Sequence, residues 1–121
     1  MAATTARRVD TATLNRLHYV GIVLAAVTGG IHLVLGVANL TSTLGVLFVL
    51  AGVGYVGGVA LLIRGVRRRP LYLAGIGFAV VQIVAYVALN AGNLFSPVAV
   101  VDKAAQLALV GVLVLLYRRE T

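Results

Sequence analysis

The sequence contains no cysteine and few charged residues. Without cysteine there is no disulfide framework, no thiolate metal site and no cysteine nucleophile. Only 11% of the residues are charged, whereas a soluble domain usually has about a quarter. The charge content therefore argues against an ordinary soluble domain. Because 61% of the residues are apolar and form long runs, we expect an integral membrane protein.

Acidic residues are especially scarce, with three Asp and Glu against ten Lys and Arg, so the net charge is +7. A basic protein can bind nucleic acid, but that function needs a continuous basic face. Here the basic residues form short clusters between apolar runs, which is the pattern of the positive-inside rule. We therefore expect no nucleic-acid partner and take the lipid bilayer as the surroundings of the chain.

Catalytic motifs are also missing. The sequence has no GxSxG, no P-loop, no HExxH and no carboxylate pair at catalytic spacing. The glycines Gly52, Gly54 and Gly57 match a dinucleotide fingerprint by letters only, because they lie inside an apolar run with no strand before it. We predict that the protein is not an enzyme, and we assign it no metal and no cofactor.

Four apolar runs predict helices at about 17–38, 44–63, 71–91 and 97–117. About 20 apolar residues are enough to cross a ~30 Å hydrocarbon core. The turns between the runs are too short for anything but antiparallel neighbours. The sequence therefore predicts an all-α fold, a four-transmembrane-helix antiparallel bundle over 17–117, with tails at 1–16 and 118–121.

The arginines predict the orientation of this bundle. Nine of them fall on one side of the predicted spans and only Lys103 falls on the other. By the positive-inside rule, both termini are expected to be cytoplasmic in a multi-pass protein of the cell membrane. The nine are Arg7, Arg8, Arg16, Arg64, Arg67, Arg68, Arg69, Arg118 and Arg119.

Small residues recur four apart on the predicted helices, a spacing that lets helix backbones approach closely in lipid. We interpret these rows as packing surfaces within the bundle rather than as a dimer face. The rows are Gly21, Ala25 and Gly29; Ala26 and Gly30; Gly54 and Gly58; and Ala104 and Ala108.

Polar residues form a second pattern. In the third run a stripe of Gln82, Tyr86 and Asn90 recurs every four residues. With a rise of about 1.5 Å per residue and the orientation above, five polar side chains fall in the outer half of the bilayer. These candidate site residues are His32, Gln82, Tyr86, Asp102 and Gln106, and Thr28 shares a helix face with His32.

An ionisable group inside a span costs at least a few kcal/mol, so it should face the bundle and have partners. We predict that Asp102 pairs with His32 or Lys103, with Gln82, Tyr86 and Gln106 completing the cluster. Where Lys103 is not paired, we expect it to extend outward along its stem.

Two functions are open for such a cluster. Hydrogen bonds between helices commonly hold membrane bundles together, which favours a non-enzymatic structural or partner subunit, either a homo-oligomer or bound to another membrane protein. The alternative is a small proton- or ion-coupled transporter that uses Asp102 and His32.

The two histidines suggest a third function. His18 and His32 are 14 residues apart, which places them about 21 Å apart and within about 40° of one helix face. This spacing resembles the paired haem ligands of b-type cytochromes. Each haem would need a second histidine, so only a homodimeric haem carrier could complete the sites. His18, beside Tyr19, is otherwise a natural residue for the membrane interface.

Three stretches, at 29–36, 67–76 and 100–120, resemble a family of small four-helix membrane proteins of halophilic archaea. The resemblance covers most of the chain from Leu17 onward. It implies the four-helix architecture and an archaeal cell membrane, and it implies no mechanism or site residues. The small multidrug exporters also have four helices at this size, but they depend on a first-helix glutamate that this sequence lacks.

Overall fold

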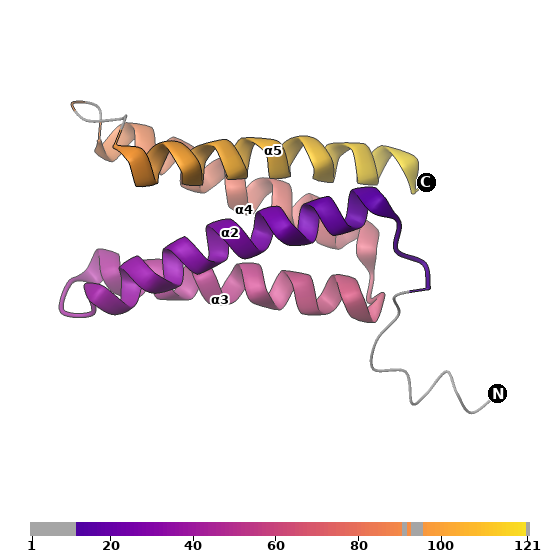
Figure 1. Ribbon diagram of the computed structural model, residues 1–121, viewed down its shortest axis with the longest axis horizontal. Coiled ribbons are helices and arrows are strands. Elements are labelled where there is room, and N and C mark those ends of the chain that lie inside the picture. Colours follow the sequence, from indigo (N-terminus) through magenta and orange to yellow (C-terminus); the bar gives the residue numbers. More distant parts are fainter. Residues whose placement is uncertain (1–11, 91, 93–95, 121) are drawn as a thin grey trace.

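The computed structural model describes residues 12–90, 92 and 96–120. Four α-helices follow one another along the chain, and no strand occurs in these residues, so the predicted all-α fold is confirmed. The helices are α2 (Arg16–Ala38), α3 (Thr43–Arg64), α4 (Arg68–Leu89) and α5 (Pro97–Arg119). Figure 1 shows the start of α2, the α3–α4 turn and the end of α5 at one end of the bundle, and the α2–α3 turn at the other.

Polar caps determine where three of the helices begin. Asn15 caps α2 by accepting from the backbone N–H groups of Leu17 and His18. The His18 side chain accepts in return from the Asn15 N–H, so histidine takes the place of the usual Glu or Gln of a capping box. Ser42 caps α3, and Ser96 caps α5 with Pro97 in its first turn.

The third helix begins at Arg68, three residues before the predicted start at 71. Pro70 is the third residue of this helix and lies in its first turn. Proline is also tolerated later in the first turn, because the N–H groups there have no intrahelical partner. The helix ends at Leu89. The predicted end at Ala91, and most of the predicted tail at 1–16, lie outside the described residues.

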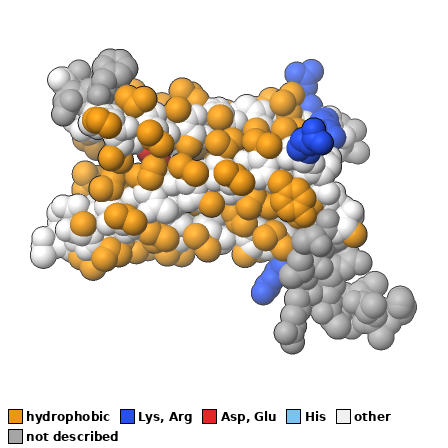
Figure 2. Space-filling view, viewed as in Figure 1, with side chains coloured by type: hydrophobic (Ala, Val, Ile, Leu, Met, Phe, Trp, Pro, Cys, Tyr) orange, Lys and Arg blue, Asp and Glu red, His pale blue; other side chains and the backbone are white. Residues whose placement is uncertain are grey.

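All four helices, of 22 or 23 residues, are long and apolar enough to cross a membrane. Large aliphatic side chains point outward along their length, with Val34 and Leu89 about 70% exposed. Figure 2 shows apolar side chains over the length of the bundle and Lys and Arg side chains at one end. Such a continuous apolar exterior is typical of a lipid-facing surface.

We call the end of the bundle that carries the described arginines the basic end, and the end with the α2–α3 turn the far end. The seven arginines at the basic end are Arg16, Arg64, Arg67, Arg68, Arg69, Arg118 and Arg119.

Helices α2 and α3 cross with their backbones in direct contact. A Cβ atom added to Gly36 would lie 2.7 Å from the backbone nitrogen of Val49 and 2.8 Å from the carbonyl oxygen of Gly45. A Cβ atom on Gly52 would lie 2.9 Å from the carbonyl oxygen of Gly29. Glycine is required at these crossings, because a Cβ atom would meet backbone atoms that cannot move aside, besides the side chains of Val49 and Leu33.

The small-residue rows are only partly packed within the bundle. Gly21, Ala25 and Gly29 are buried, as the sequence predicted. The prediction is wrong for Ala26, Ala104 and Ala108, which are exposed. In the row of Gly54 and Gly58, a Cβ on Gly54 would lie 2.7 Å from the Phe78 ring, whereas a Cβ on Gly58, like one on Gly30, would meet nothing within 4 Å. On α5 the packed face is rotated by one residue, and Ala105 and Leu109 are the buried positions.

The helices pack in the spatial order α3, α2, α5, α4. Of the four pairs of neighbouring helices, α3 and α4 touch each other least, although only a short turn joins them. Between these two helices, toward the basic end, lies an apolar cavity of about 610 Å³. The bundle is therefore closed on three sides and opens between α3 and α4.

Candidate functional site

Eight side chains from all four helices meet between the middle of the bundle and its far end. We call them the polar cluster. Helix α2 contributes two of them, α3 one, α4 two and α5 three. The members are Thr28, His32, Tyr55, Gln82, Tyr86, Asp102, Lys103 and Gln106.

Asp102 is the charged centre of the cluster and is only 5% exposed. Its Oδ1 accepts a hydrogen bond from the Thr28 hydroxyl and lies 3.7 Å from His32 Nδ1. Its Oδ2 lies 3.0 Å from Lys103 Nζ. Asp102 therefore contacts both of the partners proposed from the sequence, His32 and Lys103.

His32 is held in one orientation by its surroundings. Its Nδ1 lies 2.7 Å from the carbonyl oxygen of Thr28, and a carbonyl can only accept, so this nitrogen is assigned the hydrogen. The ring packs against Phe48, with centroids 5.0 Å apart, and against Tyr55, with centroids 5.9 Å apart. His32 thus presents its Nδ1–H toward the Thr28 and Asp102 side of the cluster.

Lys103 is paired inside the cluster and does not extend outward. Its Nζ donates to Gln106 Oε1 at 2.6 Å, contacts Asp102 and lies 5.0 Å from the centre of the Tyr86 ring. The long flexible stem lets the ammonium bend back from its own helix face. A buried carboxylate, an amide oxygen and an aromatic face together attract it more strongly than an apolar exterior could.

Gln106 connects the charged part of the cluster to α3 and α4. It is fully buried, and its Nε2 donates to the Tyr55 hydroxyl at 3.0 Å and to Gln82 Oε1 at 2.7 Å. The Tyr55 hydroxyl itself donates to Gln82 Oε1 at 2.9 Å. These bonds link three helices around one buried amide.

The cluster leaves no buried polar atom unpaired. Within the part of the chain that the structure describes, every buried side-chain nitrogen and oxygen has a hydrogen-bond partner. A fully satisfied polar network stiffens a bundle and favours one arrangement of its helices.

The model of a family of unknown function, DUF7475, matches residues 3–117. The chain belongs to this family. Comparison with curated proteins and with solved structures gave no match. The resemblance to an uncharacterised family agrees with this result, whereas an archaeal origin stays a prediction.

The polar stripe on α4 of this DUF7475 member divides into two parts. Gln82 and Tyr86 belong to the polar cluster, but Asn90 is the exposed C-cap of α4. Its Nδ2 donates to the carbonyl oxygen of Tyr86 at 3.0 Å. The spacing of four that suggested one stripe therefore combines two interior residues with a helix cap.

Sequence reasoning missed Tyr55, the only member of the cluster on α3. A single tyrosine in an apolar run has no partner at helical spacing to mark it. The available signal is general: a buried tyrosine hydroxyl usually finds a hydrogen-bond partner. Thr28 was easier to find, because it lies one turn from His32 on the same face.

A second polar group lies at the basic end of the DUF7475 bundle, formed by the buried His18 and Tyr72 and the partly exposed Glu120. His18 Nε2 lies 2.7 Å from Glu120 Oε2 and 3.1 Å from the Tyr72 hydroxyl, which donates to the same carboxylate oxygen at 2.7 Å. His18 is only 3% exposed. His18 lies at the basic end and is buried there because it joins α2 to α4 and to the end of α5.

These contacts also bear on haem. Both ring nitrogens of His18 have protein partners, with Nδ1 3.1 Å from the Asn15 backbone nitrogen. His32 points its Nδ1 at Thr28 and Asp102. An iron ligand at His18 would have to give up either the Glu120 carboxylate or the helix cap, which argues against the haem carrier. Within residues 12–90, 92 and 96–120, no three His, Asp and Glu side chains are placed to share a metal ion.

Proposed function

We propose that this protein is a non-enzymatic, structural or partner subunit in the cell membrane, with four spans held in register by the polar cluster. One observation carries the proposal: a single hydrogen-bonded network reaches side chains of all four helices and is fully satisfied. Such a network is well suited to fixing helix positions in lipid, where apolar burial between helices contributes little.

The proposed topology places both termini in the cytoplasm. It is supported by the arginines at the basic end, which include the described residues next to both tails. The resemblance of the sequence supports an archaeal cell as the source of that membrane.

The proposed partner is a second membrane protein or another copy of this chain. It is supported by small residues that the bundle leaves exposed, such as Ala104 and Ala108 on one face of α5. Affinity purification in mild detergent tests this part. Recovery of the chain with a partner, or as a homo-oligomer, is expected, and recovery as a monomer alone would count against it.

The structural role is tested by replacing Tyr55 with phenylalanine, which keeps the ring and removes the hydroxyl that contacts Gln106 and Gln82. We expect Tyr55→Phe to destabilise the bundle by about 1–2 kcal/mol, the usual range for a lost buried hydrogen bond. Unfolding in a detergent titration measures the change. The matched control is Tyr19→Phe, since Tyr19 is 48% exposed and should lose nothing measurable. Equal stability of the two variants would contradict a structural role for the cluster.

The second candidate function is a small proton- or ion-coupled transporter. The contact of Asp102 with both His32 and Lys103 favours it, because ionisable groups inside a span often mark proton pathways. Proteoliposomes containing a pH-sensitive dye distinguish the two functions. The structural proposal expects no proton flux above that of protein-free vesicles. A flux that disappears in Asp102→Asn would support the transporter instead.

A further inference from the structure

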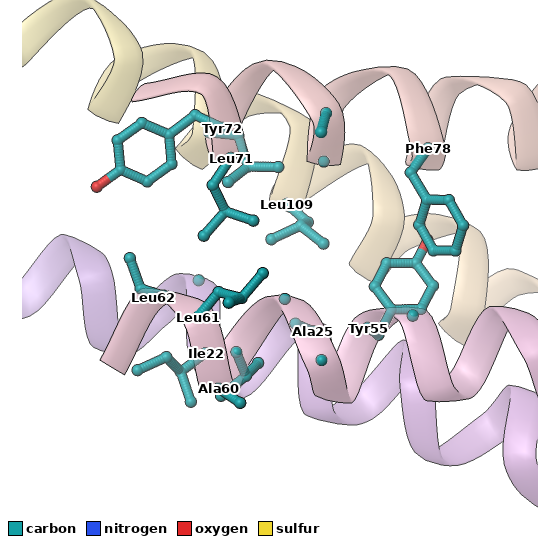
Figure 3. A pocket seen from close by; sticks show the side chains of 18 of the residues that line it. Ile22, Ala25, Tyr55, Ala60, Leu61, Leu62, Leu71, Tyr72, Phe78 and Leu109 are labelled. Atoms are coloured by element: carbon teal, nitrogen blue, oxygen red, sulfur yellow. The ribbon is translucent and has the colours of Figure 1, made fainter. Parts of the chain in front are cut away.

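The apolar cavity between α3 and α4 shares only Tyr55 with the polar cluster and has no role in the proposal above. Figure 3 shows Leu61, Leu62 and Leu71 pointing into it, with Tyr55 and Phe78 in contact at the end near the middle of the bundle. The ring centroids of Tyr55 and Phe78 are 5.0 Å apart. The cavity thus runs from this aromatic pair to the basic end and is lined almost entirely by apolar atoms.

An empty or water-filled cavity does not suit this position. Apolar walls offer water few partners, and an empty space deprives the lining atoms of dispersion contacts. The cavity has a volume of about 610 Å³, which lies within the usual ~300–1,000 Å³ of small-molecule sites. The bundle opens there between α3 and α4, the neighbouring helices that touch each other least. Lipid is therefore the apolar material that can enter the cavity.

The cavity is too small for a transmembrane helix of a partner. A helix about 10 Å in diameter that crosses one leaflet of about 15 Å would occupy roughly 1,200 Å³. That is about twice the space between α3 and α4. A single flexible hydrocarbon chain needs no such width and can follow the irregular wall.

The basic end of the cavity adds a charge. Arg64 lines the cavity and is exposed, and its guanidinium has no hydrogen bond or ion pair with the residues that the structure describes. Two neighbouring arginines are already engaged. Arg68 donates to the carbonyl oxygen of Leu62 at 2.9 and 3.0 Å, and the Arg69 guanidinium lies 3.9 Å from the centre of the Tyr117 ring.

We propose that this cavity is a lipid site that takes one hydrocarbon chain of an anionic phospholipid and holds the phosphate at Arg64. The apolar lining receives the chain, and the guanidinium donates to the phosphate oxygens, a geometry that arginine favours. The site goes beyond the proposed structural role and depends only on placement in a bilayer. Loss of lipid binding would leave the helix-joining role of the polar cluster untouched.

The first test measures lipid bound to the purified protein. The full chain is reconstituted in vesicles of equal parts phosphatidylglycerol and phosphatidylcholine, extracted in mild detergent and examined by native mass spectrometry. We expect one retained phospholipid per chain, with phosphatidylglycerol preferred. A chain that retains no lipid, or a dimer without lipid, would overturn the proposal, the latter in favour of a second copy at the opening.

Two variants with matched controls locate the site. Gly58→Leu places a side chain in the cavity without a clash, because a Cβ there meets nothing within 4 Å. We expect it to abolish the retained lipid. Gly77→Leu makes the same change at an exposed glycine outside the cavity, also with open space at Cβ, and should retain it. Equal retention by both variants would overturn the proposal.

The charge is tested separately. Arg64→Gln should lower the preference for phosphatidylglycerol over phosphatidylcholine about tenfold, the effect of losing one charge-assisted hydrogen bond. Arg118→Gln removes an exposed arginine from the same end and should leave the preference unchanged. An unchanged preference in Arg64→Gln would refute the role of that residue.

One measurement on the unaltered chain covers the case in which a variant fails to fold. Phosphatidylglycerol with a photoactivatable group on its chain is cross-linked in vesicles, and the adducts are located by peptide mass spectrometry. We expect adducts on lining residues such as Leu61 and Leu71. Adducts spread evenly over the exterior of the helices would contradict a specific site.

Discussion

Asp102 and Lys103 are neighbours in the sequence and form a salt bridge in the interior of the bundle. Adjacent residues on a helix point about 100° apart, so the bridge forms only because the lysine bends back to its neighbour. The carboxylate also accepts from Thr28, and the ammonium also donates to Gln106. At the scale of single residues, the cluster is therefore a charge pair whose members are each held by a neutral side chain.

This arrangement predicts different effects for single and double substitutions. Asp102→Leu leaves the Lys103 ammonium without its counter-ion in the interior, and we expect a loss of about 3–5 kcal/mol in the free energy of unfolding. Asp102→Leu combined with Lys103→Leu removes both charges and should recover most of that loss. Unfolding in a detergent titration compares the three proteins.

A double variant as unstable as the single one would show that pairing with Lys103 is not what makes Asp102 important. Both variants should be measured beside Tyr19→Phe, which alters an exposed residue outside the cluster.

Much of this cluster follows from the sequence, because intramembrane polar residues are rare and must face each other. Depth along the helices was enough to group Gln82, Asp102 and Gln106. The direction of the Lys103 side chain could not be predicted from the sequence, because a long side chain can place its ammonium group at several points from one backbone position. Nor could the pairing of His18 with Glu120, because 102 positions separate them and no periodicity relates the two.

At the scale of elements, the closest association in the molecule is that of α2 with α3. The contact depends on glycine in both helices, at Gly29 and Gly36 on one and at Gly45 and Gly52 on the other. Close backbone approach through small residues is a main source of helix association in lipid. The pair therefore depends on the absence of side chains at a few positions.

Two glycines of α2 form a matched pair for testing this contact. Gly36→Ala brings a Cβ within 2.8 Å of backbone atoms of α3, whereas Gly30→Ala meets nothing within 4 Å. We expect Gly36→Ala to destabilise the protein by about 1–3 kcal/mol through overpacking. Gly30→Ala should be neutral or slightly stabilising, because alanine favours helix over glycine by roughly 1 kcal/mol.

Thermal unfolding followed by circular dichroism measures both variants under one condition. Similar melting temperatures for the two would mean that α2 and α3 can separate slightly at no cost, contrary to the close crossing described above.

The sequence predicted the number and approximate ends of the helices, because hydropathy and caps are local properties. It did not show which row of small residues faces inward. In the sequence, the row of Ala25 and Gly29 has the same spacing and residue size as the row of Ala104 and Ala108. Rotation of a helix about its axis by one residue decides whether such a row faces the interior or the exterior. That rotation depends on the neighbouring helices, which local patterns do not describe.

At the scale of the whole molecule, charge is segregated along the bundle axis. The described arginines lie at the basic end, and Lys103 is used inside the bundle. Figure 2 shows this separation as basic side chains beyond an apolar belt. The positive-inside rule then favours one orientation strongly.

Because the sequence contains no cysteine, a single introduced cysteine can be labelled without a signal from other thiols of the chain. Its labelling therefore reports the orientation of the protein in the membrane. We expect Val66→Cys, in the α3–α4 turn, to react with a membrane-impermeant maleimide only after the cells are opened. Thr41→Cys, in the α2–α3 turn, should react in intact cells. The reverse pattern would contradict cytoplasmic termini, and labelling of both in intact cells would contradict a single orientation.

The opening between α3 and α4 was not predictable from loop lengths. A short turn brings the ends of two helices together, but it does not require their faces to pack along their length. Here the order of packing is α3, α2, α5, α4. The two helices that the short basic turn joins, α3 and α4, are therefore the ones whose faces separate.

This order of packing has a consequence for biosynthesis. The pair of α2 and α3 can associate as soon as both helices have entered the membrane, because their contact involves only each other. Helix α4 packs mainly on α5, which follows it in the chain. Until α5 supplies Gln106, neither Tyr55 nor Gln82 has its central partner. The polar network can therefore be completed only after α5 has been synthesised, later than the contact between α2 and α3.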